Sequence, residues 1–315
     1  MESLRKHDNT NDLDLSAEYR MIPTVFTAMA LGIGISLLIT HFFELAPAET
    51  NLTSSSKYKD QWHLSMFVQG LGHVFTFLVT AIFFWYIIEN KTSEDFSRSQ
   101  LSGVSSAWIS IAVIFSLIPV NHQIIDWNQN IQLPEILKEF EGWLRIKEQQ
   151  KTLLTQGLLP IESLSKLLIA LMVFAIIGPV GEEFFFRGVL QTKFSVWGLS
   201  PIKSIWAAAT IFSLIHFQFY GFFPRLLIRA LFGYLYLWSG NIWIQVVSHV
   251  VNNALFVLTA FTHQKWPLLG WYIEIIADNW VSFIFSFSLS GFVLYLFRKQ
   301  NFKPDVGKMK LNTDV

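Results

Sequence analysis

Long apolar runs separated by short polar stretches dominate the chain. A bilayer core about 30 Å thick is crossed by roughly 20 apolar residues in a helix, and shorter runs suffice where neighbouring helices shield them. The pattern therefore predicts an all-α polytopic membrane protein with about eight transmembrane helices. They cover residues 21–45, 63–88, 107–120, 167–189, 204–219, 226–238, 242–261 and 280–297. The third and sixth runs are short, so we expect these helices to be buried among the others.

One polar segment, residues 121–162, is long enough to hold structure of its own. Apolar side chains recur in it at helical spacing, with charged side chains between them, which predicts an amphipathic helix. The apolar positions are Ile136, Leu137, Phe140, Trp143 and Leu144. Two placements are open. The helix lies on the membrane surface, which is the more common arrangement, or it covers a cavity.

These segments divide the chain into five parts, with no internal repeat among them. The parts are a polar tail (residues 1–20), three transmembrane helices (21–120), the extramembrane loop (121–162), a core rich in candidate site residues (163–261), and the last transmembrane helix with a basic tail (262–315). Residues 1–20 lack a basic start followed by an apolar core, so we predict no cleavable signal peptide.

Composition supports the membrane prediction and excludes several functions. Of the 315 residues, 52% are hydrophobic and only 15% are charged, which is unusual for a soluble domain. The 23 basic and 23 acidic residues cancel, so no overall basic field attracts nucleic acid. Cysteine is absent, which excludes thiol catalysis, disulfides and Cys-ligated zinc.

The distribution of Lys and Arg predicts the orientation, because cytoplasmic loops carry an excess of these residues. A cytoplasmic N-terminus places most of them inside, and an even number of spans then places the basic C-terminus inside as well. The inside set is Arg5, Lys6, Arg20, Lys91, Arg98, Lys193, Lys203, Arg298, Lys299, Lys303, Lys308 and Lys310. We expect an integral protein of a bacterial cytoplasmic membrane.

Few ionisable or amide side chains interrupt the apolar second half. Such groups are rare inside membranes and usually face a protein interior or a water-filled cavity. The set is Glu182, Glu183, Arg187, His216, Arg225, Arg229, His249, Asn252 and Asn253. We expect Arg225 and Arg229, which lie near the start of a predicted helix, to extend toward the membrane interface.

Helical spacing groups the remaining side chains. Glu183 and Arg187 are four residues apart and share a helix face, so the arginine can neutralise this carboxylate. Glu182 lies about 100° around the helix and is left free. His249 and Asn253 also share a face. Together with His216, these groups come from three helices that a bundle can bring to a common intramembrane polar site.

This combination suits hydrolysis of an amide bond. A carboxylate can take a proton from water unless the arginine holds it fully ionised, and imidazole or carboxamide groups can bind a metal or donate to an oxyanion. Each piece also has a structural interpretation. A Glu–Arg pair is more often an ion pair, His216 alone is more often a core histidine, and His249 with Asn253 can join helices by hydrogen bonds. Their coincidence on consecutive polar helices favours the chemical interpretation.

Three motifs resemble one known family. Residues Glu182 to Arg187 resemble the Glu-Glu-x-x-x-Arg signature of the CAAX prenyl protease and bacteriocin-processing family (CPBP, or Abi) of intramembrane proteases. Phe212 to His216 resembles its Phe-x-x-x-His motif, and His249 to Asn253 its His-x-x-x-Asn motif. The order and spacing agree, and the likeness covers residues 167–261.

The resemblance implies an intramembrane endopeptidase that cuts a membrane-associated peptide or protein, lipidated in some relatives. It implies that Glu182 activates water, with Glu183 and Arg187 in support, and that His216, His249 and Asn253 complete the site.

Two mechanisms stay open. The family is usually described as metalloproteases, and Glu182, His216 and His249 could hold Zn²⁺. In a metal-free mechanism, Glu182 and His216 activate water while His249 and Asn253 stabilise the oxyanion. The chain lacks the His-Glu-x-x-His spacing that would favour zinc.

Two other functions compete with proteolysis. The closer one is a non-catalytic immunity or scaffold protein of the same fold. A proton-coupled transporter is less favoured, because such proteins usually show repeat symmetry and pairs of broken helices, and Pro179 is the one such interruption that the pattern suggests.

Overall fold

The computed structural model describes residues 15–42, 59–90 and 103–302, and the regular structure within these ranges is helical, with no strand. This confirms the all-α class for the described residues. The elements are α1 (Leu15–Phe42), α3 (Trp62–His73), η1 (Val74–Val79), α4 (Thr80–Ile82), η2 (Phe83–Ile88), α5 (Val104–Ser116), α6 (Ile118–Gln129), η4 (Glu135–Leu137), α7 (Lys138–Leu158), α8 (Leu164–Ala170), η5 (Leu171–Ile177), α9 (Gly178–Glu183), η6 (Phe184–Gln191), α10 (Thr192–Val196), α11 (Pro201–Leu214), η7 (Phe219–Gly221), α12 (Phe222–Ser239), α13 (Ile242–Lys265), α14 (Pro267–Ala277) and α15 (Trp280–Asn301).

Four of these helical stretches are long and apolar enough to cross a membrane. They are Trp62–Ile88, Leu164–Val196, Ile242–Lys265 and Trp280–Asn301. Helices α5 and α6 qualify together as a fifth span, although they bend by 45° at their junction. The predicted count of eight spans is therefore not confirmed. The physical reason is clearest for α11, whose 14 residues rise about 21 Å, short of a bilayer core about 30 Å thick.

Several predicted boundaries differ from the structure. The predicted helix 204–219 ends early, at Leu214, and the predicted helix 107–120 is interrupted at Leu117 between α5 and α6. Helix α14 was not predicted from the sequence. The end of the first predicted span (residues 43–45) and the basic tail from residue 303 onward lie outside the described residues.

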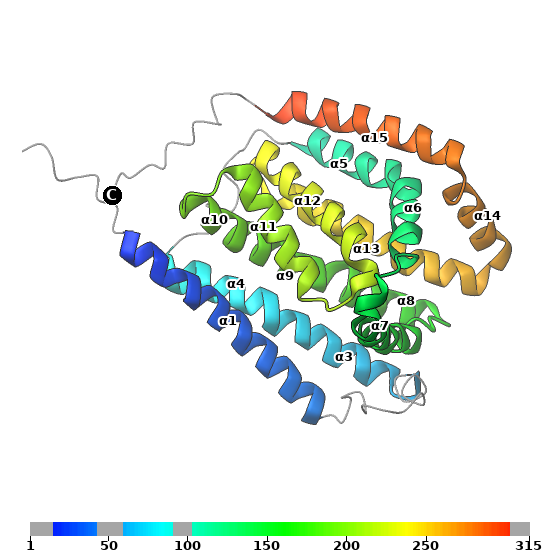
Figure 1. Ribbon diagram of the computed structural model, residues 1–315, viewed down its shortest axis with the longest axis horizontal. Coiled ribbons are helices and arrows are strands. Elements are labelled where there is room, and N and C mark those ends of the chain that lie inside the picture. Colours follow the sequence, from blue (N-terminus) through cyan, green and yellow to red (C-terminus); the bar gives the residue numbers. More distant parts are fainter. Residues whose placement is uncertain (1–14, 43–58, 91–102, 303–315) are drawn as a thin grey trace, which may run out of the picture.

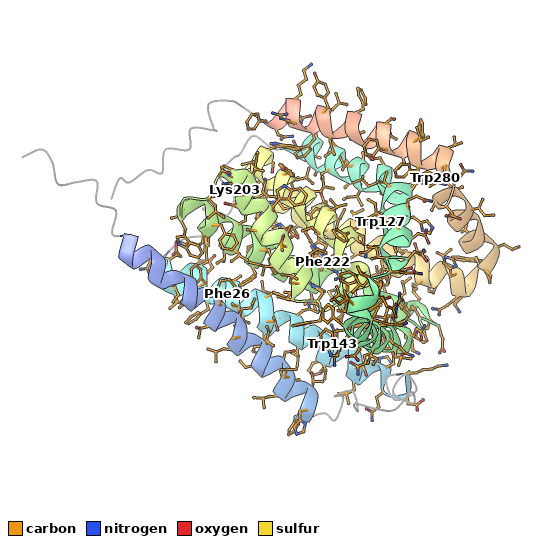
Figure 2. The ribbon with its side chains drawn as sticks, in the orientation of Figure 1. Phe26, Trp127, Trp143, Lys203, Phe222 and Trp280 are labelled. Atoms are coloured by element: carbon orange, nitrogen blue, oxygen red, sulfur yellow. The ribbon has the colours of Figure 1, made fainter. Side chains whose placement is uncertain are left out.

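The helices form a bundle with its site-bearing segment in the middle. Helix α1 packs along α3 and η1 on one side, and α15 packs along α5 on the opposite side (Figure 1). The segment from α8 to α13 lies between these pairs (Figure 1). Side chains project outward from the flanking helices (Figure 2). The exposed apolar ones include Leu31, Leu37, Phe285, Phe287 and Phe292. Such large exposed apolar faces are expected of a surface in contact with lipid.

The longest helical stretch, Leu164–Val196, carries the two adjacent glutamates. It begins at Ser163, whose side chain accepts a hydrogen bond from the backbone N–H of Lys166, as an N-cap does. It alternates between α-helix and the wider π-helical turns of η5 and η6. Pro179 lies at the start of α9, where its missing N–H cannot complete the helical hydrogen-bond pattern. Wide turns of this kind are frequent at functional sites.

The predicted amphipathic helix is present as α7 (Lys138–Leu158). It packs against α3 and against the short η7 segment that connects α11 to α12. It therefore lies across one end of the bundle, next to the turn that follows His216.

Candidate active site

Two adjacent carboxylates are buried where α9 meets η6. Glu182 is 5% exposed and Glu183 is fully buried. Gly181, directly before them, lies against η1. A Cβ atom at this position would be 3.1 Å from the backbone nitrogen of Leu78 and 3.2 Å from Cβ of Phe77. Because glycine has no Cβ, α9 can approach η1 closely here, and this brings the carboxylates next to the N-terminal half of the chain.

Arg187 lies one turn beyond Glu183 on the same helical stretch. Its Nε is 3.1 Å from Glu183 Oε2, the pairing that the four-residue spacing favours. One terminal nitrogen of Arg187 donates a 2.6 Å hydrogen bond to the backbone carbonyl of Arg229 on α12. Arg187 therefore both neutralises Glu183 and ties its helix to α12.

His249 reaches the same carboxylates from α13. It is fully buried, with Nδ1 2.8 Å from Glu183 Oε1 and Nε2 3.6 Å from Glu182 Oε2. Helices α12 and α13 are joined by a tight turn at Gly240, whose φ of 63° is left-handed, as is common just past a helix C-terminus. This turn folds α13 back along α12, so that residues of both helices meet at the carboxylates.

Arg229, which sequence reasoning assigned to the membrane interface, lies inside this cluster. It is only 7% exposed, and its terminal nitrogens are 3.4 Å from Glu182 Oε2 and 3.5 Å from Glu183 Oε1. The interfacial assignment is wrong for this residue, because two carboxylates across the bundle bind its guanidinium. Its position in the sequence could have identified Arg229 as a site residue. It lies two helical turns into α12, and an ionisable side chain inside an apolar helix is a functional candidate by default.

His73 on α3 was also missed. Its Nδ1 lies 3.7 Å from Glu182 Oε1, and its Nε2 is within 3.2 Å of Gln69 Nε2. The predicted site residues all came from the second half of the chain, from Glu182 to Asn253. The position of His73 in the middle of the apolar stretch Trp62–Ile88 could have identified it as a site residue.

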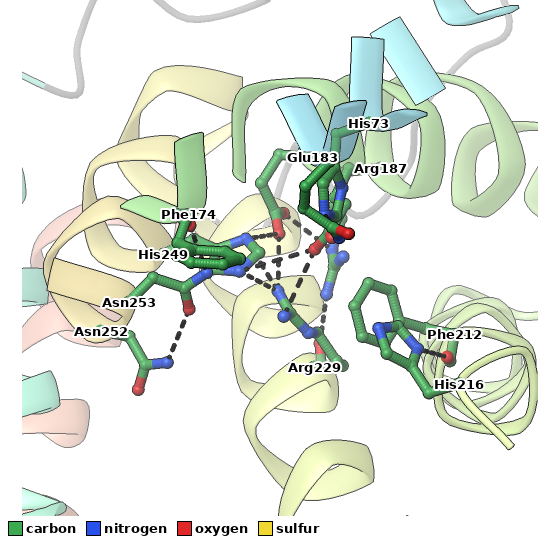
Figure 3. Close-up of polar contacts among 12 residues, drawn as sticks. His73, Phe174, Glu183, Arg187, Phe212, His216, Arg229, His249, Asn252 and Asn253 are labelled. Carbon is green, nitrogen blue, oxygen red and sulfur yellow. Dashed lines mark hydrogen bonds and ion pairs between the residues drawn. The ribbon is translucent and has the colours of Figure 1, made fainter. Parts of the chain in front are cut away.

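The other two predicted site residues lie at the edge of this cluster. Nδ1 of His216 is 2.7 Å from the backbone carbonyl of Phe212, and the side chain of Asn253 donates a 2.9 Å hydrogen bond to the carbonyl of Phe174. Among the polar contacts of the described residues, neither side chain reaches Glu182 or Glu183 (Figure 3). His216 follows the end of α11 in a turn, and the next residue, Phe217, has a positive φ of 50°.

The residues proposed for zinc do not form a metal site in this arrangement. Within the ranges that the structure describes, no group of three His, Cys, Asp or Glu side chains is placed to hold a metal ion. His216 lies apart from His249 (Figure 3), and the Arg229 guanidinium contacts both Glu182 and His249. The donor set therefore does not fit a zinc ion.

A cavity of about 200 Å³ is lined by two residues that contact predicted or observed site residues. Its polar lining includes Gln69, which contacts His73, and its apolar lining includes Phe174, whose carbonyl binds Asn253. Helix α7 contributes Lys151 and Leu158 to the wall. The helix therefore borders a cavity, as one of its two predicted placements requires, and its placement on the membrane surface stays a prediction.

A second set of charged side chains, which we call the α7–η7 network, joins α7 to the turn after α11. Glu141 forms a 2.6 Å ion pair with Arg145 and accepts a hydrogen bond from the Tyr220 hydroxyl, while Glu148 accepts one from Gln218. Hydrogen bonds from the Arg145 side chain hold the pKa of the Glu141 carboxyl below its ordinary value. The network anchors α7 over this end of the bundle.

Comparison with known proteins supports the motif assignment. Residues 164–255 match the family model described as type II CAAX prenyl endopeptidase Rce1-like. The resemblance inferred from the motifs is thus confirmed over this segment, which contains Glu182, Glu183, Arg187, His216, Arg229, His249 and Asn253.

Among curated proteins, this chain is 33% identical to the uncharacterized protein YpbD of Bacillus subtilis (strain 168) over 79 residues. The aligned part is 24% of this chain and 37% of the relative, so the chain spans little more than a third of that protein. No solved structure matches the chain. The long apolar helices indicate an integral membrane protein, and its segment 164–255 is similar to the CAAX proteases of the matched family model.

Proposed function

We propose that this protein is an intramembrane endopeptidase of the CAAX-protease type that hydrolyses a peptide bond of a membrane-associated or lipidated substrate. The observation that carries the proposal is the pair of carboxylates buried in a segment that matches the family model. Buried carboxylates surrounded by apolar helices are rare and mark functional sites.

The two carboxylates are assigned different tasks. Glu183 is held on both sides, with one oxygen 2.8 Å from His249 and the other 3.1 Å from Arg187. Glu182 is held less tightly. Its nearest charged partner, Arg229, is 3.4 Å away, farther than either of these two partners of Glu183. Glu182 is therefore better placed to accept a proton from water.

The reaction follows from that assignment. Glu182 takes a proton from a water molecule, whose oxygen attacks the carbonyl carbon of the scissile bond and forms a tetrahedral oxyanion. Collapse of this intermediate breaks the C–N bond, and Glu182 returns the proton to the departing nitrogen. We assign oxyanion stabilisation to His249 and Asn253, the latter by turning its amide away from the Phe174 carbonyl, and a supporting role in water activation to His216.

The finer topology is part of the same proposal. Helices α11 and α12 would sit inside the bundle as the fifth and sixth of eight spans, with both termini in the cytoplasm of a bacterial cell. The cavity that borders α7 is lined by Gln69, which contacts His73, and would receive part of the substrate chain.

The test compares purified protein with its Glu182→Gln variant on C-terminally lipidated peptides in detergent. Glutamine keeps the shape of the side chain and removes the base, so we expect cleavage to fall by about 100- to 10,000-fold. Glu162→Gln, which alters a carboxylate that is 59% exposed, is the matched control and should cleave at the parental rate.

Two outcomes would reject this assignment. A Glu182→Gln variant that cleaves as fast as the parent would exclude Glu182 as the base. If neither protein cleaves any membrane-associated peptide, a non-catalytic scaffold or immunity function becomes the better interpretation.

A further inference from the structure

The guanidinium of Arg229 occupies the centre of the site, although none of the three family-like motifs includes this residue. It contacts both carboxylates at 3.4 and 3.5 Å, and its NH1 lies within 2.7 Å of both ring nitrogens of His249. Figure 3 shows it between Glu183, His249 and Arg187. Arg229 is thus the one side chain with contacts to Glu182, Glu183 and His249 together among the described polar groups.

These contacts determine how His249 is hydrogen-bonded. Its Nδ1 lies 2.8 Å from Oε1 of Glu183. Arg229 NH1 lies 2.6 Å from Nε2 and 2.7 Å from Nδ1. Both nitrogens of the ring are therefore in close contact with charged side chains of the protein.

The charges of the cluster balance only if Arg229 is counted. Two carboxylates, Glu182 and Glu183, face two guanidiniums, Arg187 and Arg229. Arg187 pairs with Glu183, so Arg229 supplies the positive charge opposite Glu182. An uncompensated charge inside a protein is strongly destabilising, which makes Arg229 a requirement of this arrangement.

A dedicated pocket holds the guanidinium. Its central carbon lies 3.9 Å from the centroid of the Phe212 ring and 5.5 Å from that of Phe232. Aromatic faces attract a guanidinium and restrict its position. A lysine could not reproduce these contacts, because it offers one compact charge in place of a planar fork of donors.

We propose that the Arg229 guanidinium is the resident cation of this site and takes the position between two carboxylates and a histidine that a metal ion would otherwise occupy. It acts as a positioning residue, holding Glu182 and His249 in place. The catalytic consequence rests on the proposed function, whereas the neutralisation of the carboxylates does not depend on it.

The experiment uses full-length protein carrying Arg229→Gln, with Arg225→Gln as the matched control. Arg225 lies one turn earlier on α12 and binds Gln218 at 3.0 Å. We expect Arg229→Gln to lower the melting temperature in detergent and to reduce peptide cleavage by about 100-fold or more. Arg225→Gln should stay within about threefold of the parent.

Charge balance gives a readout that does not need catalysis. In the double variant Arg229→Gln with Glu182→Gln, one positive and one negative charge are removed together, so part of the lost melting temperature should return. The double variant also decides the matter if Arg229→Gln alone does not fold. Recovery of folded protein supports the proposal, and no recovery overturns it.

Chemical rescue and metal content complete the test. Added methylguanidinium should restore part of the cleavage by Arg229→Ala, while the same concentration of ammonium should not. The parent should keep its activity with a chelator and contain no stoichiometric metal by atomic emission. A zinc-loaded, chelator-sensitive parent would overturn the proposal, and so would an Arg229→Gln variant with parental stability and activity. If the parent cleaves nothing, the proposed function fails while the melting temperatures still test the role of Arg229.

Discussion

The buried site and the α7–η7 network are built from the same kinds of side chain but lie in different surroundings. Both pair glutamate with arginine four residues later on a helix, Glu183 with Arg187 in the site and Glu141 with Arg145 in the network. The site pair is at most 2% exposed, whereas the Arg145 side chain is 51% exposed. The same four-residue spacing of glutamate and arginine therefore occurs in a buried cluster and in a partly exposed network, and the degree of burial distinguishes the two pairs.

The two ion pairs differ in whether water can solvate their charged groups when the pair is broken. When an exposed pair is broken, water solvates both partners, so the pair contributes little to stability. When a buried pair is broken by removing one partner, the remaining charge is left in the protein interior without water to solvate it. The buried side chains therefore determine one another's positions, whereas we expect the partly exposed α7–η7 network to open more easily.

The largest effect should come from breaking the buried pair. Arg187→Gln leaves Glu183 without its closest guanidinium, and we expect a loss of about 3–5 kcal/mol of stability. The measurement is thermal or denaturant unfolding of the purified protein in detergent. A loss as small as that of Arg145→Gln would remove the distinction between the two regions.

A smaller effect should follow from adding a methyl group beside the carboxylates. Gly181→Ala places a Cβ 3.1 Å from the Leu78 backbone and must push η1 away, together with His73. We expect a destabilisation of about 1–3 kcal/mol and a clear loss of cleavage.

The control for this substitution is Gly142→Ala on α7, where a Cβ meets nothing within 4 Å. Because alanine favours a helix over glycine, this variant should gain up to about 1 kcal/mol. Equal effects of the two substitutions on stability would show that the close approach at Gly181 is unimportant.

The smallest effect concerns the pH response of the α7–η7 network. The pKa of Glu141 is lowered in the folded protein by hydrogen bonds from Arg145, so its stabilising contribution is present above its ordinary pKa of 4.5 and is lost as the pH falls through the lower folded value. Hydrogen exchange of α7, corrected for the intrinsic pH dependence, should show faster opening below pH 4.5. Glu141→Gln should remove this response, and an unchanged response in that variant would assign it to another group.

Much of the helical framework was predictable from local pattern. The apolar runs located the helices because each run must bury its backbone polar groups in its own hydrogen bonds. The number of complete spans was not predictable, because α11 is short and α5 bends into α6. Such helices must be shielded from lipid by neighbouring helices, and the sequence of a single apolar run does not show which helices pack beside it.

For the site, contacts within one helix could be predicted from the sequence, because helix geometry sets them. Four residues of helix place Glu183 beside Arg187 in any fold that keeps the helix, and the motifs identified His249. The packing of the helices places Arg229 and His73 next to the carboxylates, while His216 and Asn253 contact backbone carbonyls at the edge of the cluster. Spacing along one helix fixes relative direction, whereas contact between helices depends on how closely they pack, as Gly181 allows α9 to approach η1.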